Sequence, residues 1–314
     1  MRYFMGIDGG GSRTTACVAD EAGRILGRAT SGPSNPCKVG LATAQRHLLA
    51  SAQRAVRRSG LSHRTLDGLC AGIAGVDSAP TGRGLEAALR RAVPARHYLI
   101  TTDGITALES GLRGSDGVIV ISGTGSIAYG RDQDGRILRC GGWGTVFDDA
   151  GSGYEIGRKA ITAALRAFDG RGSASRLGDD LTRALKIRKI TDTVGASLEP
   201  HRVAALFPVV ERAARRGDTV ARRLCEEAGQ DLADLARALL KRMNGLTRNP
   251  RVVCTGGVFK SSARVRRSFA RHLRQHAPRV RIALLQREAV EGALALARAH
   301  ADAGVGAHPR TQTE

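Results

Sequence analysis

Residues 4–26 read FMGIDGGGSRTTACVADEAGRIL, and residues 118–138 read VIVISGTGSIAYGRDQDGRIL. Each stretch begins with an apolar run typical of a buried strand, passes through a glycine-rich turn, and continues into a second strand and a Gly-Arg hairpin. A unit of this length that occurs twice indicates a duplicated supersecondary structure. The sequence therefore predicts an α/β protein made of two similar halves.

The segments around these two stretches complete each half. In the first half we expect helices at residues 42–59, 82–93 and 104–113 and strands at 66–74 and 98–102. In the second half we expect a mainly helical region at 155–244, strands at 252–254 and 281–285, and helices at 260–276 and 288–301.

The predicted elements group into domains. We expect an N-terminal domain at residues 1–114 and a C-terminal domain with a helical insertion at 115–287. A helix at 288–302 is expected to pack back on the N-terminal domain. The tail at 303–314 is predicted to be disordered.

Length and composition indicate the class of protein. The chain has 314 residues, of which 42% are hydrophobic, so it can form two cores. No apolar run reaches the ~18 residues that a membrane span needs, and the start of the chain leads directly into a strand. The six cysteines form no CxxC pair and are expected to be reduced and mostly buried. We expect a cytoplasmic protein without a membrane partner.

The net charge of +20, from 49 Lys and Arg against 29 Asp and Glu, raises the question of a nucleic-acid partner. The arginines are spread along the chain as pairs on helical segments, and only 4% of the residues are aromatic. These features favour solvated helix faces over a nucleic-acid interface. A homodimer is left open.

The glycine turns predict a nucleotide site. Gly9-Gly10-Gly11-Ser12 and Gly123-Thr124-Gly125 each join two strands, and Gly256-Gly257 follows a third. Bare backbone lets N–H groups approach phosphates, and glycine also permits positive φ. A single such turn favours an ordinary hairpin over a phosphate site. Two matching turns in duplicated halves favour a cleft that holds the phosphates of ATP from both sides.

Two carboxylates stand at predicted strand ends. Asp8 precedes the first glycine turn, where it would be repelled by phosphates without a cation, so we assign it to Mg²⁺; the alternative is a turn-capping side chain. Asp103 follows the strand at 98–102 and could accept the proton of an attacking sugar hydroxyl. Its alternative role is the N-cap of the next helix.

Four more residues are candidates for a sugar pocket. Asn35 lies in a turn-rich loop, where ordinary turn chemistry is the alternative. Trp143, the only tryptophan, stands among glycines and suits either a sugar contact or a loop anchor. Asp148 and Asp149 could bind hydroxyls or cap the helix that starts near Gly153.

Three motifs, Thr101-Thr102-Asp103, Ile121–Ser126 and Gly141–Gly144, occur in the order and spacing of a known family. With them, residues 3–300 resemble the N-acetylglucosamine kinase branch of the BadF/BadG/BcrA/BcrD ATPase family. That family belongs to the actin, hexokinase and Hsp70 superfamily. The resemblance implies two ribonuclease H-like domains with a central ATP cleft.

The resemblance also implies roles for single residues. Asp103 would be the catalytic base. The first phosphate motif would be Gly9, Gly10, Gly11, Ser12 and Thr14, the second Gly123, Thr124 and Gly125, and Gly256 and Gly257 would border the adenosine. Asn35, Thr124, Trp143 and Asp149 would line the sugar pocket.

The sequence departs from this family at two places near the sugar side. Relatives usually read Gly-Asp-Glu-Gly-Ser where this chain has Asp148-Asp149-Ala150-Gly151-Ser152, and Ile127 replaces an Asn of animal relatives. We predict transfer of phosphate from Mg·ATP to the 6-hydroxyl of N-acetylglucosamine or glucosamine. The alternatives are an ATPase that drives electron transfer and a non-catalytic sugar-sensing or nucleic-acid-binding protein.

Overall fold

The computed structural model describes residues 1–76, 79–244 and 249–303. The chain divides by its internal contacts into two compact units. The first contains Met1–Ser115 and, from the C-terminal part, Leu285 through helix α12 (Ala289–Ala303), and the second contains Asp116–Leu284. The predicted tail beyond Ala303 lies outside the described residues.

The first unit contains one five-stranded sheet in the order β3-β2-β1-β4-β5. Its strands are β1 (Tyr3–Gly9), β2 (Thr14–Asp20), β3 (Ile25–Ser31), β4 (Leu66–Ile73) and β5 (Ala95–Thr101). Its helices, apart from α12, are α1 (Pro36–Val39), α2 (Leu41–Ser59), α3 (Ala79–Ala92) and α4 (Asp103–Leu112). The first three strands are antiparallel, and β1, β4 and β5 run parallel.

The second unit repeats this topology in the order β10-β9-β6-β7-β8. Its strands are β6 (Gly117–Ser122), β7 (Ser126–Arg131), β8 (Ile137–Gly141), β9 (Arg251–Thr255) and β10 (Arg281–Leu284). The antiparallel and parallel pairs match those of the first sheet one by one. The predicted α/β fold of two similar halves is confirmed.

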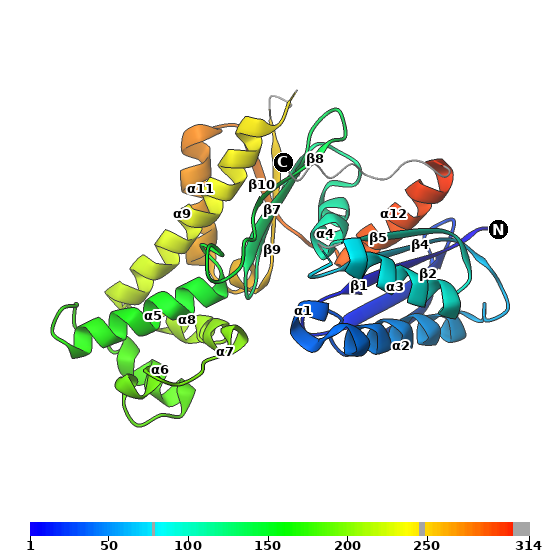
Figure 1. Cartoon of the computed structure of the whole chain (residues 1–314). Coiled ribbons are helices and arrows are strands. Elements are labelled where there is room, and N and C mark those ends of the chain that lie inside the picture. Colours follow the sequence, from blue (N-terminus) through cyan, green and yellow to red (C-terminus); the bar gives the residue numbers. More distant parts are fainter. Residues whose placement is uncertain (77–78, 245–248, 304–314) are drawn as a thin grey trace. The chain divides into compact units, whose positions relative to one another are not determined.

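The second unit carries most of the helices (Figure 1). They are α5 (Gly153–Phe168), α6 (Leu177–Leu185), η1 (Ile190–Thr193), α7 (Pro200–Ala204), α8 (Phe207–Arg215), α9 (Thr219–Arg242), α10 (Gly257–Ser261) and α11 (Ala263–His276). The predicted single helix at 260–276 is two helices, because Ser262 ends α10 and caps α11 by accepting a hydrogen bond from the Val265 amide at 3.2 Å. The short α1 was not predicted.

Side chains on alternate positions of β1 point to different layers. Met5 and Ile7 are fully buried in a core that includes Leu48 and Ala52 of α2. Each such side chain contributes roughly 1.5–3 kcal/mol by burial. Gly6 lies on the opposite face together with Asp8, so β1 divides the core from the layer that carries the first candidate site.

That opposite face is covered by α12, shown in red in Figure 1. A Cβ atom at Gly6 would lie 2.6 Å from the Leu294 amide nitrogen, and one at Gly68 would lie 2.5 Å from the Ala297 carbonyl oxygen. The bare backbone of these two strand positions therefore lets the helix lie directly on β1 and β4. Within the described residues, no helix is both long enough and apolar enough to cross a membrane.

Candidate active site

The carboxyl ends of three parallel strands meet at one edge of the first sheet. Asp8 of β1 pairs with Gly72 of β4, which in turn is in register with Thr101 of β5. Adjacent strands are about 4.8 Å apart, so these three positions form a short row. Open α/β sheets bind ligands at such an edge.

Asp103 lies just beyond this row, as the first residue of α4. The N-cap position belongs to Thr102, so the interpretation of Asp103 as the N-cap is wrong. The helix start is held close to the sheet, because a Cβ atom at Gly72 would lie 2.4 Å from the Thr106 side chain, whose hydroxyl donates to the Asp103 carbonyl at 2.9 Å. The sheet and α4 therefore fix the backbone that carries the Asp103 carboxyl group.

The carbonyl groups of the three glycines in the first turn are all occupied. The Gly9 oxygen accepts from the Ala74 amide at 2.8 Å and the Gly10 oxygen from the Ser34 amide at 3.1 Å. The Gly11 oxygen accepts from the Lys38 ammonium at 2.7 Å. In contrast, the Gly11 and Ser12 amides donate no hydrogen bond to any acceptor within the described residues. The turn therefore presents donors, which is what an anion requires.

The loop between β3 and α1 supports this turn. Ser34 is fully buried, and its hydroxyl has no hydrogen-bond partner in the described part of the chain; a Cβ at Gly9 would lie 2.4 Å from it. The Asn35 oxygen accepts from the Cys37 amide at 2.9 Å and caps α1. Asn35 thus makes the ordinary turn hydrogen bond that was the alternative to a sugar contact. Its side-chain amide nitrogen remains available for other contacts. Thr14 donates its hydroxyl to the Gly32 carbonyl at 2.7 Å.

Asp8 is a half-buried carboxylate without a hydrogen bond among the described residues. Burial raises its pKa to about 6, and the negative charge of Glu288 acts in the same direction, whereas Arg13 lowers it. Turn capping would require a hydrogen bond to a nearby backbone amide. The capping interpretation of Asp8 is therefore not supported.

The second glycine turn shows the same division of donors and acceptors. The Gly123 and Thr124 oxygens accept from the Gly153 and Tyr154 amides of α5 at 2.8 and 3.1 Å, and the Gly125 oxygen accepts from the Gly123 amide at 2.9 Å. No acceptor in the described ranges lies on the Thr124 and Gly125 amides. A Cβ at Gly123 would meet nothing within 4 Å, which leaves open space in front of the turn.

Asp149 lies behind the second turn. Its carboxylate accepts from the Ser126 amide at 3.0 Å, and a Cβ at Gly125 would lie 2.8 Å from the same oxygen. Burial raises the Asp149 pKa despite this hydrogen bond. The predicted helix-capping role of Asp148 or Asp149 is wrong, because Ser152 caps α5.

The third glycine turn adjoins the second. A Cβ at Gly256 would lie 2.0 Å from the Ser122 carbonyl oxygen, and Gly256 has a φ of +100°. Gly257 faces open space. The predicted residues of the second unit are thus brought to one edge of its sheet. None of Gly9, Gly10, Gly11, Gly123 and Gly125 has a left-handed φ, so in these turns glycine provides room rather than unusual dihedrals.

Trp143 follows β8 on a loop that is exposed to solvent. The indole is 67% exposed, and the Arg139 guanidinium lies over its ring, 4.7 Å from the centroid. Gly141, Gly142 and Gly144 all have positive φ. The structure thus places Trp143 outside the core, as the flanking glycines predict.

Three residues of these two edges, namely Ser34, Lys38 and Arg139, were not predicted from the sequence. Ser34 and Lys38 belong to the segment that also contains Asn35, and the lysine could have been noted because a cation close to a phosphate turn is favourable. Arg139 gave no signal among so many arginines. The predicted cleft between the two halves, and the roles assigned to single residues, stay predictions.

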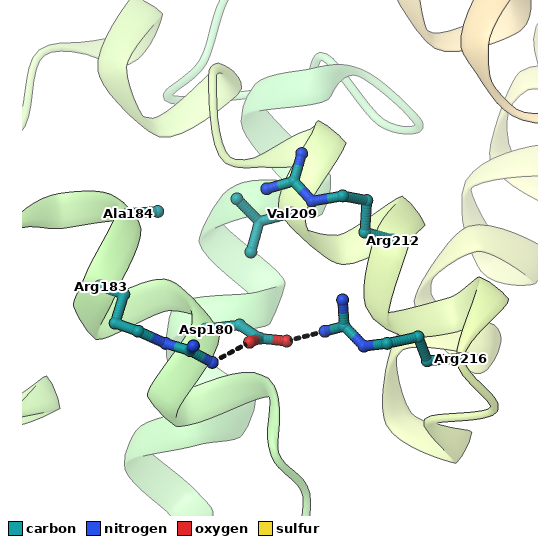
Figure 2. A pocket seen from close by; sticks show the side chains of 6 residues that line it. All are labelled: Asp180, Arg183, Ala184, Val209, Arg212 and Arg216. Atoms are coloured by element: carbon teal, nitrogen blue, oxygen red, sulfur yellow. Dashed lines mark hydrogen bonds and ion pairs between the residues drawn. The ribbon is translucent and has the colours of Figure 1, made fainter.

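One cavity of the second unit contains none of the predicted residues. It measures about 360 Å³ and lies between α6 and α8 (Figure 2). Figure 2 shows that Asp180 is paired with Arg183, at 2.5 Å, and with Arg216. A single carboxylate shared by two arginines ties the helices together, and we assign this group to the fold rather than to the site.

Comparison with known proteins places these two edges in context. The sequence profile of the BadF/BadG/BcrA/BcrD ATPase family matches residues 5–297. An N-acetylmuramic acid/N-acetylglucosamine kinase of Clostridium acetobutylicum is 33% identical over 96% of this chain and 100% of its own length. An N-acetyl-D-glucosamine kinase of Dictyostelium discoideum is 31% identical over 81% of this chain and 84% of its own.

Solved structures agree on the fold. A Chromobacterium violaceum protein assigned as an N-acetylglucosamine kinase has a TM-score of 0.79 and 28% identity, with 94% of this chain and 99% of that chain covered. A hexokinase of the ROK family from Thermus thermophilus has a TM-score of 0.59 at 19% identity, covering 96% of this chain and all of that one, which supports the fold alone.

Two duplicated sheets of this topology, each with a donor-lined glycine turn at its edge, define the two-domain actin-like ATPase fold. Within that class, the chain belongs to the BadF/BadG/BcrA/BcrD ATPase family.

Proposed function

We propose that this protein is an ATP-dependent kinase that transfers the γ-phosphoryl group to the 6-hydroxyl of an amino sugar, N-acetylglucosamine or glucosamine. The relatives that match most of the chain are kinases of N-acetylated amino sugars, and the match extends over their full or nearly full length. This similarity favours a kinase over an ATPase that drives electron transfer.

The observation that carries the proposal is the state of the glycine turns. The carbonyls of Gly9–Gly11 and Gly123–Gly125 are bonded to neighbouring backbone or to Lys38. The amides of Gly11, Ser12, Thr124 and Gly125, in contrast, have no acceptor in the described part of the chain. Unbonded amides at a strand edge are costly unless an anion or water accepts from them. The phosphates of ATP would supply the missing acceptors.

Asp103 is the proposed catalytic base. In the reaction, the sugar hydroxyl oxygen forms a bond to the γ-phosphorus, the hydroxyl proton passes to the Asp103 carboxylate, and the bond from the γ-phosphorus to the bridging oxygen breaks to release ADP. Its place at the end of β5 and the start of α4 supports this role, since both elements fix its backbone.

Asp8 would hold Mg²⁺. It fits that role because it is a partly buried carboxylate with no hydrogen bond of its own among the described residues, next to a turn that presents donors for phosphate. Mg²⁺ commonly binds one or two carboxylates through water together with substrate phosphates, so no larger cluster of side chains is needed. When bound, the ion would neutralise phosphate charge.

The remaining proposed roles concern the sugar. Asn35, Thr124, Trp143 and Asp149 would line its pocket, with Asp149 using the carboxylate oxygen that is not bonded to the Ser126 amide. The cytoplasmic location, the absence of a nucleic-acid partner and the question of a dimer stay predictions from the sequence.

The test is an assay of ADP release with Mg·ATP and a panel that includes N-acetylglucosamine, glucosamine, N-acetylmuramic acid and glucose. We expect an amino sugar to be the preferred acceptor. The Asp103→Asn variant should lose about 10²–10⁴-fold in kcat, the usual contribution of a general base, with little change in ATP binding. Wild-type turnover in Asp103→Asn would refute the catalytic assignment.

A further inference from the structure

The loop that carries Trp143 is held at its far end, where the Gly144 carbonyl accepts from the Phe147 and Asp148 amides, but within the described residues no backbone hydrogen bond holds Gly142 or Trp143. Gly141, the last residue of β8, and Gly142 and Gly144 of the loop have φ between +74° and +88°. Glycine loses more conformational entropy on ordering than any other residue. The indole is two-thirds exposed, so core packing does not fix its orientation. A group outside the loop must supply the restraint if Trp143 is to have one conformation.

Arg139 of β8 makes three contacts to this loop. Its Nε donates to the Gly141 carbonyl at 3.1 Å, and one terminal nitrogen donates to the Gly142 carbonyl at 2.6 Å. The face of the same guanidinium covers the Trp143 ring at 4.7 Å. A planar guanidinium can make two parallel hydrogen bonds and a stacking contact at once, which a lysine ammonium cannot.

Arg139 is itself held at its backbone. Its carbonyl oxygen accepts from the Arg242 side chain at 2.9 Å, at the end of α9, and its strand pairs with β7 through Tyr129. A continuous series of contacts therefore runs from a long helix and a sheet to a single exposed indole.

We propose that Arg139 is a positioning residue for the acceptor sugar: it fixes the glycine loop and covers one face of the Trp143 indole, which leaves the opposite face and the ring edge for the sugar. This inference rests on the proposed function, because it takes the sugar contact of Trp143 as given. Arg139 itself does not touch the reacting atoms.

The chain offers a direct reporter of this arrangement, since Trp143 is its only tryptophan. Fluorescence excited beyond the absorption of the four tyrosines therefore reports on the loop alone. The variants are Arg139→Ala, which removes all three contacts, and Arg139→Lys, which keeps the charge. The matched control is Arg166→Ala, which removes an exposed arginine side chain of α5 that makes no hydrogen bond or ion pair within the described residues.

We expect the free Arg139→Ala and Arg139→Lys proteins to show lower tryptophan anisotropy and stronger acrylamide quenching than wild type and Arg166→Ala. The KM for the sugar should rise about tenfold in both Arg139 variants, with kcat and the KM for ATP within about threefold of wild type, because a misplaced binding group weakens ground-state binding. Circular dichroism melting separates these effects from loss of folding.

The inference is overturned if Arg139→Lys leaves anisotropy, quenching and sugar KM at their wild-type values. It is also overturned if both fluorescence measures change while the sugar KM does not, since Arg139 would then hold the loop without affecting sugar binding. Failure of the proposed function has another signature: the wild-type protein would phosphorylate no amino sugar, while the fluorescence of the free variants would still show whether Arg139 holds Trp143.

Discussion

In the first unit the last antiparallel pair before the glycine turn is Gly9 with Thr14, and in the second unit it is Ser122 with Ser126. By register, Asp8 therefore corresponds to Ile121, and Gly9 to Ser122. The first edge carries a carboxylate where the second carries an apolar side chain. Sheets of equal topology thus differ in the charge they carry at equivalent positions of the strand edge.

The two turns also differ in how they are braced. The first is supported by two segments, one that holds Ser34 and Lys38 and one that follows β4 and holds Ala74. The second is supported by two amides of α5, by the Asp149 carboxylate and by close contact with Gly256. Equal topology therefore does not imply equal rigidity, and each brace can be removed separately.

Gly256→Ala should have the largest effect. The new methyl group would lie 2.0 Å from the Ser122 carbonyl oxygen, at a φ of +100° that alanine rarely adopts. Strain and steric overlap together should lower the free energy of unfolding by about 3–5 kcal/mol, measured by urea denaturation. Gly123→Ala is the matched control, since its methyl group meets nothing within 4 Å; it should change stability by less than about 1 kcal/mol. Equal losses in the two variants would contradict the comparison.

Asp149→Ala should have the next largest effect. It leaves the buried Ser126 amide without its acceptor and puts alanine at a φ of +66°, which together should cost about 2–3 kcal/mol. Asp149→Asn keeps an oxygen acceptor and tolerates this φ, so its loss in urea denaturation should be under about 1 kcal/mol. If the two variants were equally stable, Asp149 would not brace the turn.

Asp8→Asn tests the first edge and should have the smallest effect. The folded-state pKa of Asp8, about 6, lies above the ordinary value of 3.8, so the folded protein binds this proton more tightly than the unfolded chain. The Asp8 contribution to stability therefore increases as pH falls from 7 to 5, by about 1 kcal/mol, and is lost as pH rises through 6.

Urea denaturation at pH 7 and pH 5, without Mg²⁺ or nucleotide, measures this difference. The gain on acidification should be about 1 kcal/mol smaller in Asp8→Asn than in wild type. An identical pH response in both proteins would show that Asp8 is more solvated than its surroundings indicate.

The sequence predicted the topology well because both halves show the same order of strand, glycine-rich turn and hairpin. Aligning the halves by their glycines would have set Asp8 against Ser122, whereas the strand registers set it against Ile121. The cause is that the first turn, Gly10–Arg13, is one residue longer than Gly123–Gly125. A repeat seen in sequence does not give the hydrogen-bond register.

The supports of the site could not be predicted in the same way. The bond from Asp149 to the Ser126 amide joins positions 23 residues apart, and the Lys38 contact with Gly11 spans 27 residues. Such contacts depend on how loops fold over the sheet edges, and a single sequence carries no local pattern for them. Arg139, four positions before a lone tryptophan, is a nearer neighbour that could be sought in other chains.

The helix α12 covers β1 and β4, although it is the last element of the described residues and they are among the first. On the ribosome, Asp116–Leu284 of the second unit emerges before this helix does. Until then, the face of the first sheet that contains Gly6 and Gly68 is not covered by α12. This exposed face is a surface that chaperones could recognise. A premature stop codon before Ala289 would therefore damage the amino-terminal unit, far in sequence from the lesion.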